Sequence, residues 1–195
     1  LKAALIQGIV ESGCTVMDLG IVPTGVVYRS TVDLDVDSAI AITASHNPPE
    51  YNGLKIMHEG LPVAGGYLQR LKAIFESHSQ GTSNSPGTIL SKSEYHHTVI
   101  DAIVQDVGPL SRRVRVAVDS ANAVPGPFMV ELCDKLGVDL VDLNCSWDHG
   151  SPAHPADPTR PENMTQLSDL VANSDCEFGI GVDGDGDRIG VVDEN

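Results

Sequence analysis

The decisive stretch of the chain is AITASHNPPEYNGLK, residues 41–55, which passes from a small apolar run into two consecutive prolines. Residues 39–43 predict a short buried strand, and the prolines end regular structure after it. Ser45 and His46 therefore emerge where a strand ends. Because ligands of α/β proteins bind beyond the ends of the strands, the segment predicts an α/β fold with its chemistry at this edge.

The composition is that of a strongly acidic globular protein. Hydrophobic residues make up 41% of the 195 residues and aromatic residues 4%, which is enough for a buried core. A total of 12 Lys and Arg against 27 Asp and Glu gives a formal net charge of -15, which opposes binding to nucleic acid or anionic membrane. No apolar run approaches the ~18 residues that a membrane helix needs. We expect neither a nucleic-acid partner nor a membrane partner.

The four cysteines lie far apart without a C-x-x-C pair, so they predict neither a zinc site nor a disulfide framework. A reduced, cytoplasmic setting is the default, since no signal-peptide pattern is present. Leu1 begins inside an amphipathic pattern, and the chain stops just after a strand-like run. We therefore expect a piece of a longer protein.

Periodicity and helix-start residues predict two α/β units. The predicted helices cover 1–12, 23–32, 64–78 and 94–107, and the predicted strands of the first unit cover 15–19, 38–43 and 53–57. Residues 79–93 are rich in Ser, Gly and Thr, which predicts a flexible loop. We place the domain boundary near its end, with one domain at 1–95 and the other at 96–195.

The second unit repeats the pattern of the first. In each unit a glycine ends an amphipathic helix and a strand closing on Asp-Leu follows, in GCTVMDLG (13–20) and in GVDLVDLN (137–144). Further on, another helix precedes a small apolar strand, 39–43 in the first unit and 178–182 in the second. Internal duplication and the common helix–glycine–strand order of α/β proteins both explain this pattern.

The loop after strand 178–182 is VDGDGDRIG, residues 182–190, and it contains the carboxylates Asp183, Asp185 and Asp187. The intervening glycines let the backbone curl so that all three can face one point. Unpaired, these carboxylates repel one another. The cluster therefore predicts a hard divalent cation, Mg²⁺ or Ca²⁺, because such ions take oxygen ligands.

Two other readings of this acidic loop exist. Its spacing fits a calcium-binding EF-hand, with Glu194 as the twelfth position. Arg188 stands where that loop requires glycine, however, and the flanks predict strands where an EF-hand needs helices. The other alternative is a solvated acidic turn that holds no ion.

Arg188 adds a permanently charged, planar donor that suits a paired grip on phosphate oxygens, so phosphate is the expected substrate group. Ser45 needs activation to act as a nucleophile. With His46 it could form part of a hydrolytic triad, although adjacent residues rarely face each other and G-x-S-x-G is absent. Alternatively, Ser45 carries a phosphoryl group whose oxygen completes the shell of the metal.

Two segments together resemble the phosphoserine loop and the metal loop of the α-D-phosphohexomutases: TASHNPPEYNGLK (43–55) and DGDGDRIGVVDE (183–194). The family includes phosphomannomutase and phosphoglucomutase, and HPADPTRPEN (154–163) resembles the stretch between its two loops. The resemblance covers almost the whole chain. It implies most of the first two of four domains, as two similar α/β domains, each with a small mixed sheet sandwiched by helices.

The resemblance implies a phosphohexomutase that interconverts hexose 6-phosphate and hexose 1-phosphate, with mannose or glucose as the sugar. Phosphorylated Ser45 would pass its phosphoryl group to a sugar hydroxyl and recover the other phosphoryl group of the bisphosphorylated intermediate. Mg²⁺ would be held by an oxygen of phosphorylated Ser45 and by Asp183, Asp185 and Asp187. As catalysis would rest on positioning and electrostatics, little else is required of the protein.

Other residues take roles from the same resemblance. Lys55 matches the lysine after Tyr-Asn-Gly and either clamps phosphate or shuttles the hydroxyl proton, unless it is an ordinary solvated strand residue. His46 is expected to orient the loop or a phosphate and not to act as the base. Arg188 and Asn47 are expected to bind phosphate, unless Asn47, which precedes a proline, only shapes the turn.

The missing C-terminal domains of the parent chain would supply most substrate contacts, so the fragment itself is expected to lack mutase turnover. A metal-dependent phosphatase, in which water accepts the phosphoryl group, is the enzymatic alternative. A calcium-binding interaction module is the alternative outside enzymology.

Prolines recur at every third residue near the second domain's middle, at 152, 155, 158 and 161. This is the period of polyproline II and predicts an extended, stiff strap. A partner-binding P-x-x-P ligand is the alternative. Pro161 followed by Glu162 fits the first turn of a helix, which favours a structural role.

Overall fold

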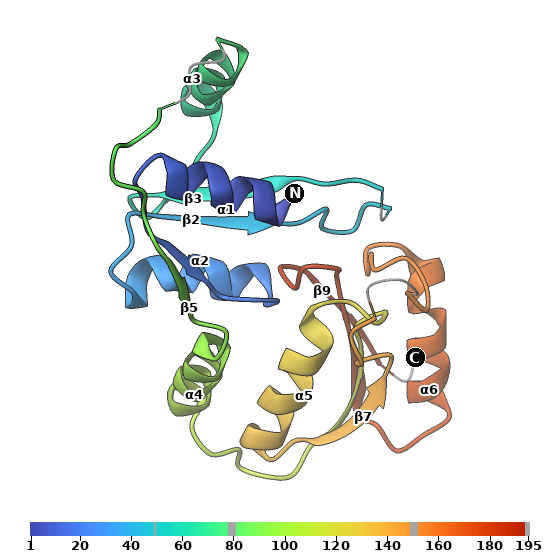
Figure 1. Ribbon diagram of the computed structural model, residues 1–195. Helices are drawn as coiled ribbons and strands as arrows, with labels where there is room; N and C mark the ends of the chain where they lie inside the picture. Colours follow the sequence, from blue (N-terminus) through green and yellow to red (C-terminus); the bar gives the residue numbers. More distant parts are fainter. Residues whose placement is uncertain (49, 78–80, 149–151, 194–195) are drawn as a thin grey trace.

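The computed structural model describes residues 1–48, 50–77, 81–148 and 152–193, and it confirms the α/β class (Figure 1). The first half contains α1 (Lys2–Glu11), β1 (Val16–Asp18), α2 (Thr24–Asp33), β2 (Ser38–Ile42), β3 (Leu54–His58), β4 (Leu61–Pro62), α3 (Gly65–Glu76) and β5 (Ile89–Ser91). The second half contains α4 (Tyr95–Val107), β6 (Arg115–Asp119), α5 (Pro125–Leu136), β7 (Asp139–Leu143), the 3₁₀ helix η1 (Pro161–Met164), α6 (Thr165–Ala172), β8 (Phe178–Val182) and β9 (Ile189–Val192). None of the described helices combines the length and hydropathy needed to span a bilayer.

The second unit is a four-stranded sheet between helices, with the strand order β7-β6-β8-β9. β6 pairs in parallel with β7 and β8, and β9 runs antiparallel to β8. Side chains alternate along β6: Val116 and Val118 join the core that includes Cys133 of α5, whereas Ala117 joins Leu167 of α6. The two helices therefore cover opposite faces, as the sequence predicts.

The first unit follows the same order of elements. The series α1, β1, α2, β2, β3 corresponds to α5, β7, α6, β8, β9, and each series ends in an antiparallel hairpin. Gly13 and Gly137, which follow the first helix of each series, both adopt positive φ angles, 95° and 72°. This common element order supports the repeat that the sequence predicts.

Hydrogen bonding divides the described strands of the first unit into two sheets. One is the parallel pair β1-β5 and the other is the antiparallel sheet β2-β3-β4. In the second unit β6 joins the strands that correspond to β1 and β2. No described strand of the first unit bonds to both β1 and β2. The single mixed sheet expected for this unit is therefore divided into two sheets.

The prediction of a flexible loop over 79–93 is wrong for β5 (Ile89–Ser91), whereas residues 81–88 form no helix or strand; residues 79 and 80 lie outside the described residues. β5 pairs in register with β1, Val16 opposite Ile89. A Cβ on Gly87 would lie 1.9 Å from the carbonyl oxygen of Cys14, so the segment packs directly on the backbone after α1. Tertiary pairing thus orders residues whose composition predicts a loop.

The prediction of an extended, stiff polyproline strap is also wrong over the described residues 152–160, which contain bends and a turn. The segment makes one tertiary and one local hydrogen bond that an extended strap would not: His154 Nε2 lies 2.9 Å from Asp119 Oδ2 of β6, and Asp157 Oδ1 accepts a hydrogen bond from the Thr159 hydroxyl. A helical turn does begin at Pro161, as expected.

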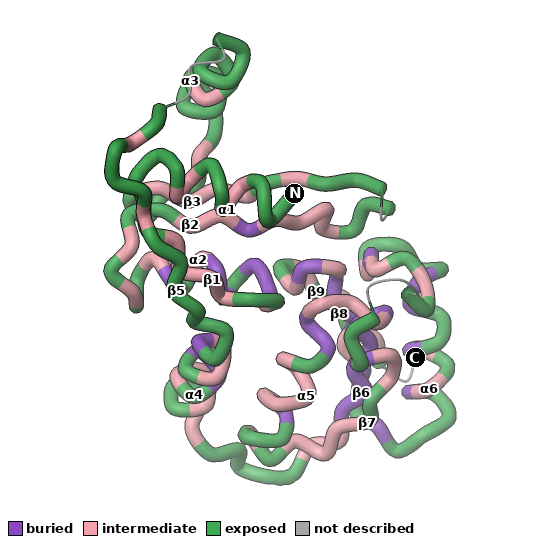
Figure 2. The backbone as a smooth tube through the Cα atoms, viewed as in Figure 1, coloured by how far each residue is buried: buried purple, intermediate pink, exposed green. Residues whose placement is uncertain are grey.

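α4 connects the two units. Its Tyr95 hydroxyl donates to Asp33 Oδ2 of α2 at 2.8 Å, and Tyr95 and Val99 share a core with Val26 of α2 and Phe128 of α5. Figure 2 shows buried residues along β6 and β8, whereas α1 and α3 contain none. The α4 core therefore fixes the position of one unit against the other.

Replacing Leu167 by Ala is expected to lower the free energy of unfolding by about 2–5 kcal/mol, because Leu167 is fully buried and its removal leaves a cavity. Urea unfolding followed by the fluorescence of Trp147, the only tryptophan, measures the change. The matched control is Leu68→Ala on exposed α3, expected to change stability by less than about 0.5 kcal/mol. Equal effects of the two substitutions would contradict the assignment of the core.

Candidate functional site

Two loops from different units meet at the candidate site. Ser45 lies in the loop between β2 and β3, and the three aspartates lie in the loop between β8 and β9. A Cβ on Gly184 would lie 2.1 Å from the carbonyl oxygen of Ser45, so the two backbones touch where only glycine fits. The structure therefore brings together the segments that the sequence analysis joined into one site.

Ser45 directs its hydroxyl at the acidic loop. Its Oγ lies 3.2 Å from Asp183 Oδ2 and 3.0 Å from Arg188 Nη2. The backbone of Ser45 has φ 56°, a left-handed conformation that is uncommon outside glycine, and its N–H donates to Thr43 Oγ1 at 2.7 Å. Such strained residues cluster at functional sites, where surrounding contacts hold them.

Asp183 is fully buried and anchors the acidic loop. Its Oδ1 accepts hydrogen bonds from the backbone N–H groups of Asp187 (2.9 Å) and Arg188 (3.0 Å). Its Oδ2 accepts from Arg188 Nη2 at 2.6 Å. Burial would lower the pKa of Arg188, but the carboxylate of Asp183 outweighs burial and raises it, so the guanidinium stays charged.

Asp185 is buried, and its two carboxylate oxygens differ in their contacts. Its Oδ2 accepts hydrogen bonds from Thr24 Oγ1 (2.9 Å), Thr43 Oγ1 (2.9 Å) and Lys55 Nζ (2.7 Å). Burial raises the pKa of Asp185, but these three donors outweigh it, so the pKa is lowered and the carboxylate is charged. Asp185 Oδ1 is buried and has no hydrogen-bond partner among the described residues.

Lys55 bridges two of the aspartates. Its Nζ lies 2.7 Å from Asp185 Oδ2 and 2.6 Å from Asp187 Oδ2. Burial would lower the pKa of Lys55, but the two carboxylates raise it, so Lys55 is an ammonium ion at neutral pH. A charged ammonium donates hydrogen bonds to carboxylate or phosphate oxygens and cannot accept a further proton.

The acidic loop fits a hard divalent cation. Asp183, Asp185 and Asp187 each offer one carboxylate oxygen, and these atoms lie within 4.8 Å of one another. The partnerless oxygen of Asp185 supplies a free ligand, and an all-oxygen donor set suits Mg²⁺. The three carboxylates also exceed the two cations, Lys55 and Arg188, by one formal charge.

The EF-hand reading of this loop is wrong. β8 and β9 flank the loop and pair with each other, Val182 opposite Ile189, so the loop closes a β-hairpin and has no helix on either side. Glu194, the twelfth position of the proposed EF-hand, lies outside the described residues. The cluster thus requires a different coordination pattern from that of an EF-hand.

His46 and Asn47 follow Ser45 and differ in their contacts. His46 Nδ1 lies 3.2 Å from Ser45 Oγ and also contacts Arg188 Nη2. The Asn47 side chain instead donates to the carbonyl of Ala44 at 2.9 Å, which closes the turn. The roles of both residues in phosphate binding remain predictions, and for Asn47 the observed contact is structural.

Three residues of the site were missed by sequence reasoning. Thr24 and Thr43 both hydrogen-bond to Asp185, and Asp157 Oδ1 lies 3.9 Å from Arg188 Nη1. The hydroxyl of Thr159 lowers the pKa of Asp157 despite burial, so this carboxylate also faces the arginine as an anion. The sequence signals were the threonine after Pro23 at a helix start, the position of Thr43 at the start of TASHNPPEYNGLK and the position of Asp157 inside HPADPTRPEN.

Known families match both units. The phosphoglucomutase/phosphomannomutase alpha/beta/alpha domain I matches residues 1–82, and alpha/beta/alpha domain II matches residues 94–195. Phosphoglucomutase from Neisseria gonorrhoeae is 36% identical over 189 residues, which is 95% of this chain and 40% of that protein. Phosphomannomutase/phosphoglucomutase from Pseudomonas aeruginosa is 36% identical over 193 residues, 98% of this chain and 41% of that protein.

Solved structures agree with the sequence matches. The crystal structure of a phosphoglucomutase/phosphomannomutase family protein from Burkholderia thailandensis has a TM-score of 0.92 and 35% identity, over 99% of this chain and 43% of that one. A putative phosphomannomutase from Thermus thermophilus shares the fold, with a TM-score of 0.69 and 22% identity. The chain spans about 40% of the length of these curated relatives. Both of its units match consecutive domains of one family, and the chain therefore belongs to the phosphoglucomutase/phosphomannomutase family.

Proposed function

We propose that the intact protein is a phosphohexomutase that interconverts hexose 6-phosphate and hexose 1-phosphate, with Ser45 as its phosphoryl carrier. The observation that carries the proposal is the position of Ser45 Oγ, 3.2 Å from a buried aspartate and 3.0 Å from an arginine of the other unit. Family membership supports the same reaction. The chain spans about 40% of its relatives, so turnover is assigned to the intact protein, and this chain alone is expected to be inactive.

Asp183, Asp185 and Asp187, with an oxygen of phosphorylated Ser45, would hold Mg²⁺. The bound ion supplies charge neutralisation for the transferring phosphoryl group. Arg188 holds Ser45 Oγ and Asp183 together, which orients the serine for transfer. In this proposal residues 1–95 form the domain that carries the serine, and residues 96–195 form the domain that carries the aspartates.

The reaction consists of two successive phosphoryl transfers. The bond between phosphorus and Ser45 Oγ breaks as a bond forms to a sugar hydroxyl oxygen, whose proton passes to a base. The bisphosphorylated sugar then returns its other phosphoryl group to Ser45 Oγ, and the released sugar oxygen regains a proton. After the two transfers Ser45 is phosphorylated again, so no co-substrate is consumed.

Lys55 and His46 assist differently in this scheme. The raised pKa of Lys55 keeps it protonated, which supports a clamp on phosphate over a proton shuttle. His46, beside both Ser45 and Arg188, orients the serine loop and a phosphate oxygen. Asn47 shapes the turn through its hydrogen bond to the Ala44 carbonyl.

Replacing Ser45 by Ala in the intact protein is expected to remove the phosphoryl carrier. Intact mass should show a single phosphate on the unsubstituted protein that is absent from the variant, and conversion of hexose 1-phosphate to 6-phosphate should fall by at least about a thousandfold. The matched control is Ser38→Ala, an exposed serine at the start of β2, which should retain both phosphate and activity.

The same assay separates a mutase from a phosphatase. A mutase forms sugar 1,6-bisphosphate and releases little inorganic phosphate, because water is not the acceptor. Inorganic phosphate as the main product of the intact protein, or a phosphate mapped to a serine other than Ser45, would overturn the proposal.

Replacing Asp185 by Asn is expected to weaken Mg²⁺ binding by at least about tenfold, because the amide removes a charged oxygen from the cluster. Isothermal titration with Mg²⁺ and the Mg²⁺ dependence of activity measure the loss. The control is Asp35→Asn on the exposed segment before β2, expected to leave both curves unchanged. An unchanged Mg²⁺ dependence for Asp185→Asn would argue that the ion binds elsewhere.

Replacing Gly184 by Ala is expected to push the two loops apart, because the new Cβ would overlap the Ser45 carbonyl. A displacement of about 1 Å can lower turnover by about a hundredfold, so activity should fall by that order. The control is Gly8→Ala in α1, where nothing lies within 4 Å of the new Cβ. Full activity of Gly184→Ala, with both variants folded by Trp147 fluorescence, would show that the close approach is dispensable.

A further inference from the structure

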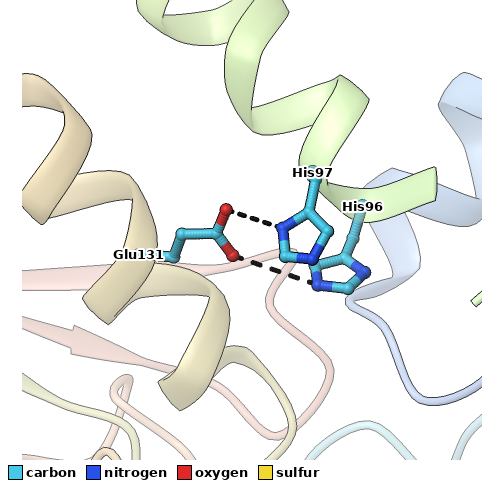
Figure 3. Close-up of side chains that lie close together, drawn as sticks. All are labelled: His96, His97 and Glu131. Carbon is cyan, nitrogen blue, oxygen red and sulfur yellow. Dashed lines mark hydrogen bonds and ion pairs between the residues drawn. The ribbon is translucent and has the colours of Figure 1, made fainter. Parts of the chain in front are cut away.

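Two histidines and a glutamate gather between α4 and α5 (Figure 3), in a group separate from the three aspartates. His96 and His97 lie in the first turn of α4, and Glu131 lies in α5. Glu131 Oε1 is 2.7 Å from His97 Nδ1, and Glu131 Oε2 is 3.9 Å from His96 Nε2. One ligand atom from each of the three half-buried residues lies within 4.8 Å of the others.

The outward nitrogen of each ring is already held by an oxygen. His96 Nδ1 lies 2.8 Å from the carbonyl oxygen of Ser93, which can only accept, so this nitrogen carries the proton. His97 Nε2 lies 3.1 Å from Glu94 Oε2, a second acceptor. Both inward nitrogens are therefore left to face the Glu131 carboxylate, and outer hydrogen bonds of this kind orient histidines that bind metals.

His97 Nδ1 and the Glu131 carboxylate need a proton or a metal ion to hold them this close together. The carboxylate oxygen and a ring nitrogen without a proton are both acceptors, and at 2.7 Å they would repel each other. Either a proton on the imidazole or a metal ion resolves this conflict. A metal ion also uses His96, whose Nε2 is too far from Glu131, at 3.9 Å, for a hydrogen bond.

We propose that His96 Nε2, His97 Nδ1 and a Glu131 oxygen form a binding site for a divalent transition metal of the zinc class. Two imidazoles and a carboxylate suit Zn²⁺, Co²⁺ or Ni²⁺, whereas the hard ions Mg²⁺ and Ca²⁺ prefer oxygen ligands alone. Water would complete the coordination shell. The high negative charge of the chain, -15, favours the approach of a dication.

Metal binding at this cluster would clamp α4 to α5. The clamp acts at the junction of the two units, because α4 also packs on α2 through Tyr95 and Val99. An ion that binds the folded protein and not the unfolded chain raises the unfolding temperature. The site does not depend on the proposed mutase activity, and its ligands are separate from the acidic loop.

The ammonium group of Lys135 competes with a metal ion for Glu131. Its Nζ lies 3.2 Å from Glu131 Oε1 and 2.6 Å from Asp101 Oδ1. A bound dication would repel this ammonium. Displacing Lys135 towards Asp101 would cost free energy and so weaken metal binding. Removing the charge with Lys135→Met should therefore tighten metal binding, a change that a merely structural lysine would not produce.

The experiment is a titration of the intact protein, free of any histidine tag, with Co²⁺ or Zn²⁺ while excess Mg²⁺ occupies the acidic loop. We expect one Co²⁺ per chain with the visible absorption of a nitrogen-containing site, and a rise in the unfolding temperature with Zn²⁺. His96→Gln, His97→Gln and Glu131→Gln should each lower the affinity by at least about tenfold. Lys135→Met should raise it.

The matched control is His58→Gln, a histidine of β3 that lies outside the cluster and should leave metal binding unchanged. Unfolding without metal shows that each variant is folded. The proposal is overturned if the intact protein binds neither Co²⁺ nor Zn²⁺ in excess Mg²⁺. It is equally overturned if folded His96→Gln and His97→Gln bind as tightly as the unsubstituted protein.

Discussion

The contact between the Ser45 carbonyl and Gly184 is the constraint on which the site depends. Residues 138 positions apart in the chain bring their hydroxyl and carboxylate within 3.2 Å, and this is possible only because the two loop backbones touch. A side chain at position 184 would occupy the space of the Ser45 carbonyl. Thr43 then completes the junction, because its hydroxyl accepts from the Ser45 N–H and donates to Asp185.

Such a close approach requires both loops to be held rigidly. Each loop joins two paired strands, β2 with β3 and β8 with β9, so its ends are fixed by a ladder of hydrogen bonds. The shared core of α2, α4 and α5 then fixes one unit against the other. The proposed phosphoryl transfer would depend on such precise positioning, because catalysis of this reaction rests mostly on orientation and electrostatics.

The sequence predicted those features that local chemistry determines. The alternating aspartates and glycines of 183–187 and the strand before Ser45 were predicted because carboxylate repulsion, glycine freedom and apolar runs act within a few residues. Thr24 and Asp157 were missed, because an ordinary threonine or aspartate gains its role only from a distant partner. β5 was missed for the same reason: Ile89 lies in a polar segment and is ordered by pairing with β1.

Each of the two candidate metal clusters places carboxylate oxygens beside a protein cation. Lys55 and Arg188 lie beside the three aspartates and leave one negative charge uncompensated, whereas Lys135 lies beside the single carboxylate of the second cluster, Glu131. The two clusters differ in their other donors, which are oxygens alone in the first and imidazole nitrogens in the second. Under the two proposals, the aspartate oxygens would take Mg²⁺, and the imidazole nitrogens of the second cluster would take a softer metal.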